Sequence, residues 1–167
     1  MRHRRSLLGL ACAAALPGCV VVEARPGPPA APAPPPPEIG SLAAYATVQA
    51  VEPAMRLVRL GTAGGGVFDM TFPDGRNLAR LRPGMTVIAE YDAAGRPLIA
   101  TSLGAAREAA PGRIRGMLAE VLDGGAFLVL VGPDRVPRTV AVPSQTMMAF
   151  ATRLGTGAEV AVTLLSF

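Results

Sequence analysis

Apolar residues recur along this chain in short segments that glycine and proline separate. Four such segments follow one another in the middle of the chain, at residues 46–51, 55–60, 67–72 and 85–91. Each has the length of a β-strand and is rich in β-branched residues, and turn-forming residues such as Glu52-Pro53-Ala54 lie between them. The pattern therefore predicts an all-β fold for the chain from about Tyr45 onward.

The second part of the chain repeats this plan. Shifting the sequence by 70 residues superimposes apolar positions and turn breakers, and after a three-residue insertion the shift becomes 73. The matched pairs include Val48 with Leu118, Val51 with Val121, Leu57 with Phe127, Phe72 with Val142 and Pro73 with Pro143. Residues 80–87 and 153–160 then share an Arg-Leu-x-x-Gly-x-x-Val pattern. Two copies of one unit predict an internal duplication.

Each unit contains about 55–60 residues in the order strand, turn, strand, loop, strand, short helical stretch, glycine turn and strand. This order fits a small five-stranded barrel of the OB or SH3-like type. Over residues 45–103 and 113–165 the pattern resembles the small OB-like domains of periplasmic and lipoprotein families. We therefore expect two tandem barrel-like repeats, at residues 41–108 and 109–167, after a disordered N-terminal segment.

The two copies differ in their second strand. Arg56 and Arg59 interrupt it in the first copy, whereas the second copy has the uninterrupted apolar run from Ala126 to Val131, led by the hairpin turn Asp123-Gly124. Continuous apolar strands are usually buried on both faces. We expect this strand to lie against the other copy or in a homo-oligomer, the alternative being a more apolar barrel core.

The first residues have the composition of a secretory signal. Arg2, Arg4 and Arg5 precede the apolar run 7–17, which small residues end. The run is too short for a permanent membrane span, which needs about 20 apolar residues. We therefore expect this segment to direct export of the chain.

The end of this run, Leu16-Pro17-Gly18-Cys19, resembles the bacterial lipoprotein signal. In that family the peptidase cuts before the cysteine, whose thiol carries a diacylglyceryl group and whose amino group is usually acylated. The resemblance implies that residues 1–18 are removed and that Cys19 is the lipid attachment site. Cys19 would then anchor the protein in a membrane, because two or three acyl chains bind stably. Val20 favours the outer membrane, facing the periplasm. Ordinary cleavage after Ala24 is the alternative.

Residues 19–40 then form the lipidated N-terminus and its linker. The tract 25–37 is RPGPPAAPAPPPP, a composition that favours polyproline II and cannot build a core. At about 3.1 Å per residue it predicts a spacer of a few tens of ångströms between lipid and folded part.

Charge excludes one class of partner. The chain has 16 arginines, no lysine and 12 acidic residues, and three arginines leave with the signal. Thirteen arginines then face 12 acids, and aromatic residues make up only 4% of the chain. A nucleic-acid interface needs clustered cations with stacking aromatics, so we expect no nucleic-acid partner.

Several catalytic chemistries lack their residues. The only histidine, His3, lies in the segment that we expect to be removed, and we expect Cys19 to be acylated. The mature chain then has no histidine base, no thiol nucleophile and no lysine for a phosphate loop, so Gly64-Gly65-Gly66 reads as a flexible loop. We expect no enzyme activity and no cofactor; an enzyme would require a cleft of converging carboxylates.

Methionine offers one metal-binding alternative. Thioethers favour Cu(I), and Met147 and Met148 are adjacent. Neighbouring residues do not share a helix face, so core filling is the competing interpretation. The sequence thus favours a noncatalytic binding or scaffolding role in the cell envelope, with an envelope protein or polymer as partner. Copper handling through these methionines is the alternative.

Overall fold

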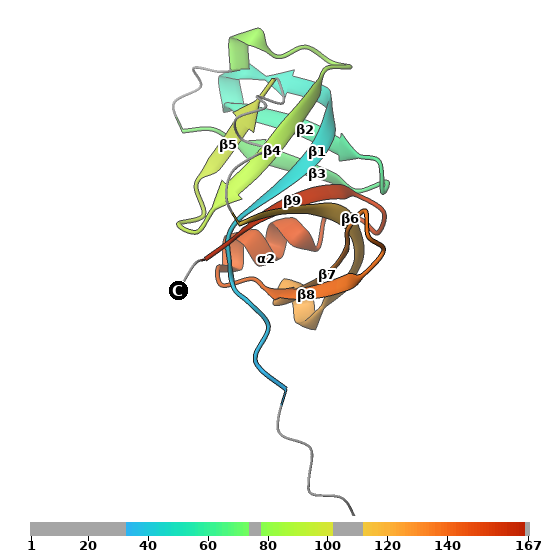
Figure 1. The fold of residues 1–167 in the computed structure, drawn as a ribbon. Helices are drawn as coiled ribbons and strands as arrows, with labels where there is room; N and C mark the ends of the chain where they lie inside the picture. The colour runs from blue at the N-terminus through green and yellow to red at the C-terminus, as the bar shows by residue number, and fades with distance from the viewer. Residues whose placement is uncertain (1–32, 74–77, 102–111, 166–167) are drawn as a thin grey trace, which may run out of the picture. The chain divides into compact units, whose positions relative to one another are not determined.

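The structure, a computed structural model, describes residues 33–73, 78–101 and 112–165. Cys19, the signal segment and most of the proline tract lie outside these residues, as does the predicted boundary between residues 108 and 109. The described residues form mainly β-strands with a single α-helix, which confirms the all-β fold (Figure 1). We call residues 45–101 the first half and residues 112–165 the second half.

The strands of the first half follow the sequence pattern closely except at its start. They are β1 (Ile39–Glu52), β2 (Leu57–Thr62), β3 (Val67–Thr71), β4 (Thr86–Asp92) and β5 (Pro97–Ala100), with the 3-10 turns η1 (Pro53–Met55) and η2 (Leu78–Arg80). The predicted strand 46–51 is only the end of β1, which begins inside the segment predicted as linker. The start of β1 was not predicted, because Gly40, Ser41 and the alanines at 43 and 44 give no regular alternation of apolar and polar residues.

The second half has the same order of elements. They are β6 (Arg113–Leu122), η3 (Asp123–Gly125), β7 (Phe127–Val131), β8 (Pro137–Ala141), α2 (Gln145–Ala151) and β9 (Glu159–Leu164). β6 and β7 form the predicted hairpin, and Asp123 and Gly124 are both at positive φ. Because Leu122 pairs with Phe127, the connection contains four residues, Asp123 to Ala126, rather than Asp123 and Gly124 alone.

Strand pairing recurs at the offsets found in the sequence. Val48 pairs with Leu60 before a bulge in β1, and Leu118 pairs with Leu130 before a bulge in β6. The Val48 amide donates to the Met85 carbonyl at 2.9 Å, and the Leu118 amide donates to the Ala158 carbonyl at 2.8 Å. The two halves therefore share register and topology, at shifts of 70 and 73 residues.

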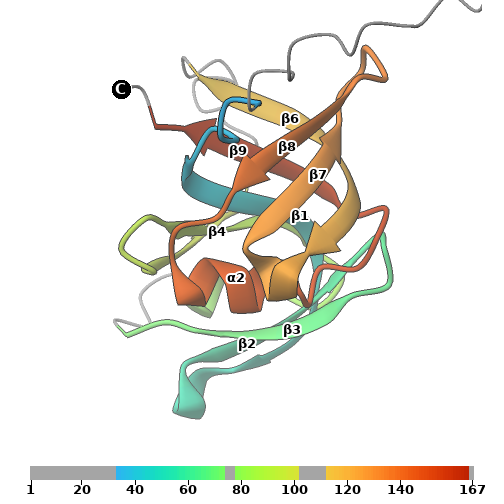
Figure 2. The same ribbon diagram turned by 90° about the horizontal axis from the view of Figure 1, so that it is seen from below.

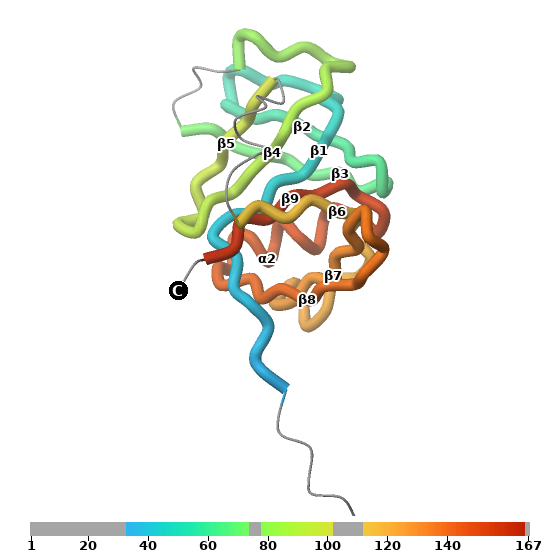
Figure 3. Tube along the Cα trace, viewed as in Figure 1, coloured from blue at the N-terminus to red at the C-terminus, as the bar shows by residue number. Residues whose placement is uncertain are grey.

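The first strand joins the two halves. β1 pairs with β9 from Ile39, with β4 from Ser41 and with β2 from Ala46, so that its beginning and end lie in different halves (Figure 3). Beside β9, Glu38 forms a parallel bridge with Ala141 of β8. The start of β1 thus occupies the place of a fifth strand beside β6–β9. The expected second repeat, made of its own five strands, is not what the described residues form.

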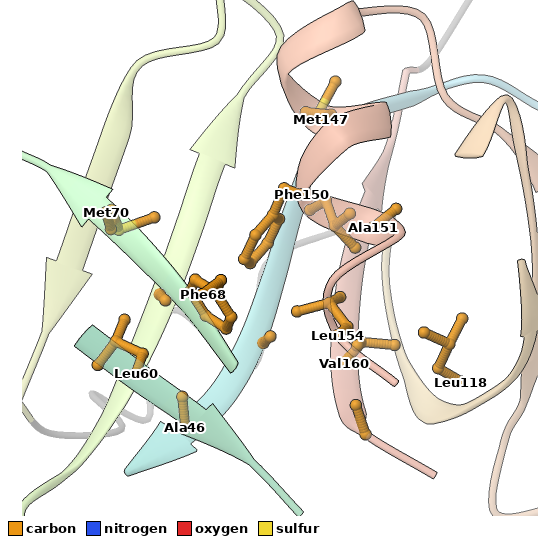
Figure 4. Packing of buried hydrophobic residues seen from close by; sticks show 14 of the residues in the cluster. Ala46, Leu60, Phe68, Met70, Leu118, Met147, Phe150, Ala151, Leu154 and Val160 are labelled. Carbon is orange, nitrogen blue, oxygen red and sulfur yellow. The ribbon is translucent and has the colours of Figure 1, made fainter. Parts of the chain in front are cut away.

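The main hydrophobic core draws its residues from both halves, and Ala43, Ile88 and Ala161 form a second, smaller cluster. Phe150 of α2 packs edge-to-face on Phe68 of β3 and on Tyr91 of β4, with ring centroids 4.9 and 5.1 Å apart (Figure 4). Figure 2 shows α2 beside β3, although these elements are far apart in sequence. Residues 34–167 accordingly form one compact unit. Burial of apolar surface therefore stabilises both halves together.

The apolar strand β7 is buried on one face. Leu128 and Leu130 lie in the core, while Phe127, Val129 and Val131 are half-buried. β7 pairs with β6 and β8. Within one chain β7 is therefore buried on one face only, since alternate side chains of a strand point to opposite faces. A homo-oligomer through 126–131 stays a prediction.

A buried ion pair connects the halves on the other face of the central sheet. Arg113 Nη1 of β6 lies 3.5 Å from Glu90 Oε1 of β4, and each side chain is 9% exposed. Ser41 Oγ of β1 donates to Thr163 Oγ1 of β9 at 3.2 Å beside this pair. These polar groups lie in four different strands, so their contacts depend on the assembled sheet.

Candidate ligand-binding site

Polar side chains gather on the outer face of β1, β2 and β3. In β2 and β3, Val58, Leu60, Phe68 and Met70 point into the core. The residues between them must face outward, because successive side chains of a strand alternate. Arg59 and Asp69 are directly opposite one another in the β2–β3 register. The alternation thus places a cation and an anion side by side on the surface.

Arg59 and Asp69 form a two-pronged ion pair. Arg59 Nε lies 2.8 Å from Asp69 Oδ1, and Nη2 lies 3.0 Å from Oδ2. This fork geometry suits guanidinium and carboxylate. Hydrogen bonding from Arg59 lowers the pKa of Asp69, and Asp69 raises the pKa of Arg59. Both groups are therefore charged at neutral pH, and Arg59 occupies both oxygens of the carboxylate.

The second half adds Arg153 to this surface. Ser144 begins α2 by accepting the amide of Met147 at 3.2 Å, and the helix ends before the Arg153 amide, which donates to Phe150 at 3.0 Å. Arg153 is exposed, and among the described residues no acceptor is hydrogen-bonded or ion-paired with its guanidinium. Its charge also lowers the pKa of Asp69. It is therefore available to an anionic ligand.

Close backbone packing positions Arg153. The loop between β2 and β3 lies against residues 153–157, and Thr62 Oγ1 donates to the Leu154 carbonyl. A Cβ at Gly66 would overlap the carbonyl groups of Arg153 and Leu154, and one at Gly64 would lie 2.6 Å from the Thr156 carbonyl. The prediction of a merely flexible triple-glycine loop is therefore wrong. Its glycines permit a contact between the halves that other residues would block.

We expect Gly66→Ala to lower the free energy of unfolding by about 1–3 kcal/mol, because an added methyl must push the two backbones apart. Gly65→Asn is the matched control, since nothing lies within 4 Å of a Cβ at Gly65 and asparagine tolerates its φ of +80°. Urea unfolding followed by circular dichroism measures both. Equal stability of Gly66→Ala and the natural chain would contradict the contact.

Two adjoining hollows surround these charges, and we call them together the junction hollow. The larger has a volume of about 530 Å³ and is lined by Gln49, Arg59, Val67, Phe68, Asp69 and Arg153. The smaller has a volume of about 170 Å³ and is lined by Phe68, Asp69, Tyr91, Thr146, Ala149, Phe150 and Arg153. Three residues line both hollows, so one ligand can occupy them continuously. The junction hollow draws its residues from both halves.

Three aromatic side chains, those of Phe68, Tyr91 and Phe150, form the floor of the smaller hollow, and two of them are almost completely buried. Phe68 and Phe150 are each 4% exposed, and their rings pack edge-to-face against each other. Burial raises the pKa of Tyr91, which keeps its hydroxyl protonated at neutral pH. The lining thus offers little surface of the two phenylalanine rings, together with the half-buried Tyr91 and the hydroxyl group of Thr146.

The methionines singled out in the sequence lie elsewhere. Met147 is fully buried in the core (Figure 4). Met148 is partly buried and packs against the same core. Their placement agrees with core filling. The described residues contain no group of three or more His, Cys, Asp or Glu side chains that could hold a metal ion. No helix in this described part is long and apolar enough to cross a membrane.

The site was not predicted from the sequence, although the sequence contained information on some of its residues. Asp69 lies within the predicted strand 67–72, and the β2–β3 hairpin places Arg59 opposite it. Arg153 was noted only as part of a repeated motif. Nothing local to its sequence indicates Asp69 as a neighbour, because the two residues are 84 positions apart.

Comparison with known proteins adds no family to this description. No protein-family model matches the chain, and no curated protein matches its sequence.

Proposed function

We propose that this chain is a noncatalytic binding protein of the cell envelope, which holds its partner in the junction hollow. One observation carries the proposal. The hollow brings Arg59 and Asp69 from the first half together with Arg153 from the second, so that two cations face one anion. Concave sites with a few converging polar groups are the usual form of ligand sites.

The charges of the junction hollow support binding rather than catalysis. A general acid or base works best when its pKa lies near the working pH. The pKa of Asp69 is shifted downward by Arg59, and that of Tyr91 is shifted upward by burial, so both move away from neutrality. Neither group is placed to exchange a proton during turnover.

We further propose that Cys19 anchors the protein in the outer membrane, facing the periplasm, after removal of residues 1–18. Nineteen residues separate Cys19 from the first residue of β1, Ile39, and the proline tract lies among them. A tether of this composition spans a few tens of ångströms. It would let the junction hollow meet a protein or polymer near the membrane.

The experiment replaces Val67, at the rim of the junction hollow, with a photo-reactive amino acid in the full chain expressed in bacteria. We expect a discrete cross-linked product from the membrane fraction, identified by mass spectrometry. The same replacement at Val136 is the matched control, because Val67 is 51% exposed, Val136 is 50% exposed, and Val136 lines neither hollow. A product from both positions, or from neither, would contradict the proposed site.

A Cys19→Ser chain tests the anchor in the same preparation. We expect the natural chain to have the mass of residues 19–167 plus diacylglyceryl and acyl groups, and the variant to lose these groups and the cross-linked product. A lipid-free natural chain that begins near Arg25 in the soluble fraction would exclude the anchor, whatever the cross-linking result.

A further inference from the structure

We propose that the junction hollow receives an extended, acidic peptide segment of a partner protein, which adds as a strand to the open edge of β3 and places a carboxylate on Arg153. This inference rests on the proposed binding function and names the chemistry of its ligand. Three features of the described residues carry it: an edge strand, a charge imbalance and the form of the aromatic floor.

The edge strand comes first. Among the described strands, β3 pairs with β2 alone and lies at the end of the sheet order. An edge strand presents unpaired backbone amides and carbonyls, which an extended peptide can satisfy. The smaller hollow lies along this strand, since Phe68 and Asp69 form one wall of it and α2 forms another. Its position suits a peptide backbone beside β3.

The charge imbalance selects an acidic side chain. Arg59 already binds both oxygens of Asp69, whereas the Arg153 guanidinium has no acceptor among the described residues. Arg153 lines both hollows, so a carboxylate in either one lies within its reach. Guanidinium recognises carboxylate through two parallel hydrogen bonds. A basic ligand would meet two arginines and an aspartate whose charge is already neutralised.

The aromatic floor favours a peptide over an acidic polysaccharide. Sugars bind aromatic side chains through an open ring face, and Phe68 and Phe150 are each only 4% exposed. Among the residues that line the smaller hollow, the half-buried Tyr91 is then the one aromatic ring with appreciable exposed surface. Small apolar side chains of a peptide can instead contact Ala149 and the edges of the rings, while Thr146 and Tyr91 supply hydroxyl groups. The floor thus fits alternating small apolar and polar side chains.

The test uses the full chain isolated from the membrane and a fluorescein-labelled, amidated heptapeptide array. Each member alternates valine and threonine and carries one glutamate or, in its matched counterpart, one glutamine. We expect glutamate at one central position to strengthen binding at least about tenfold over glutamine by fluorescence anisotropy, because a charge-assisted hydrogen bond forms. Raising the salt concentration should weaken this preference.

Arg153→Gln should abolish the preference for glutamate, and Arg80→Gln is its matched control. Arg80 is the residue that corresponds to Arg153 at the 73-residue shift, is also exposed and lines neither hollow. Bound peptide should also slow hydrogen exchange in β3 but not in β8. Binding that no acidic position strengthens, or a preference that survives Arg153→Gln, would overturn the inference.

Cross-linking from Val67 separates this inference from the proposed function. A discrete product that contains a sugar polymer or lipid but no peptide would leave the binding function intact and reject the acidic peptide. Absence of any product specific to Val67 would reject the binding function itself.

Discussion

A chain that begins at Tyr45 is expected to remain unfolded, although it contains both sequence repeats from their first predicted strand onward. Residues 39–44 pair with β9, and residues 41–44 also pair with β4, so the truncation removes a strand from the middle of the sheet. Ile39 and Leu42 are fully buried. Burial of each such side chain contributes about 1.5–3 kcal/mol, against a total stability of about 5–15 kcal/mol.

The loss extends beyond these two side chains. Without the start of β1, the exposed edges of β4 and β9 have no common partner, and the Glu38 bridge to Ala141 is lost from β8. Circular dichroism and thermal unfolding measure the result. A chain that begins at Pro34 is the control and should unfold cooperatively. A Tyr45 chain with a similar unfolding temperature would show that the halves are independent.

Glu90→Ala is expected to lower the free energy of unfolding by about 3–5 kcal/mol, because it leaves the Arg113 guanidinium buried without its carboxylate. Both side chains of this pair are 9% exposed, so water cannot replace the missing partner readily. Glu159→Ala is the matched control. Its pair with Arg115 is largely exposed, at 35% and 47%, and such pairs contribute at most about 1 kcal/mol.

The double variant Glu90→Leu/Arg113→Met distinguishes an ion pair from simple packing. Replacing both charges with apolar side chains of similar volume should restore most of the stability lost in Glu90→Ala, since no buried charge is then left unpaired. Urea unfolding of the natural chain, of Glu90→Leu, of Arg113→Met and of the double variant gives the coupling energy between the two side chains. Additive effects in this cycle would contradict a direct interaction between Glu90 and Arg113.

Much of the secondary structure followed from local sequence. Strands of the second half and the turns at Glu52-Pro53-Ala54 and Asp123-Gly124 were predictable, because alternation and turn chemistry act within a few residues. The start of β1 was not, because residues 41–44 are buried on both faces of the strand and therefore show no alternation of apolar and polar side chains. Its small residues fit the crowded centre of the sheet.

The candidate site was predictable only in part. Arg59 and Asp69 could have been paired from the register of one hairpin, which the turn length determines. The role of the triple glycine could not, because glycine is needed at Gly66 for a backbone contact with Arg153 and Leu154, which are 87 and 88 positions away in the chain. The local sequence shows that residue 66 has no side chain, but it does not show which distant part of the backbone occupies that space.

The amino-acid sequence by itself determined the all-β fold, the turns and the recurring register, because these depend on interactions between near neighbours. Only the tertiary structure placed the start of β1 beside β9, Glu90 beside Arg113 and Arg153 beside Asp69. Each of these neighbours comes from a distant part of the chain. Their meeting depends on how the two halves pack around one core, which no local pattern of residues encodes.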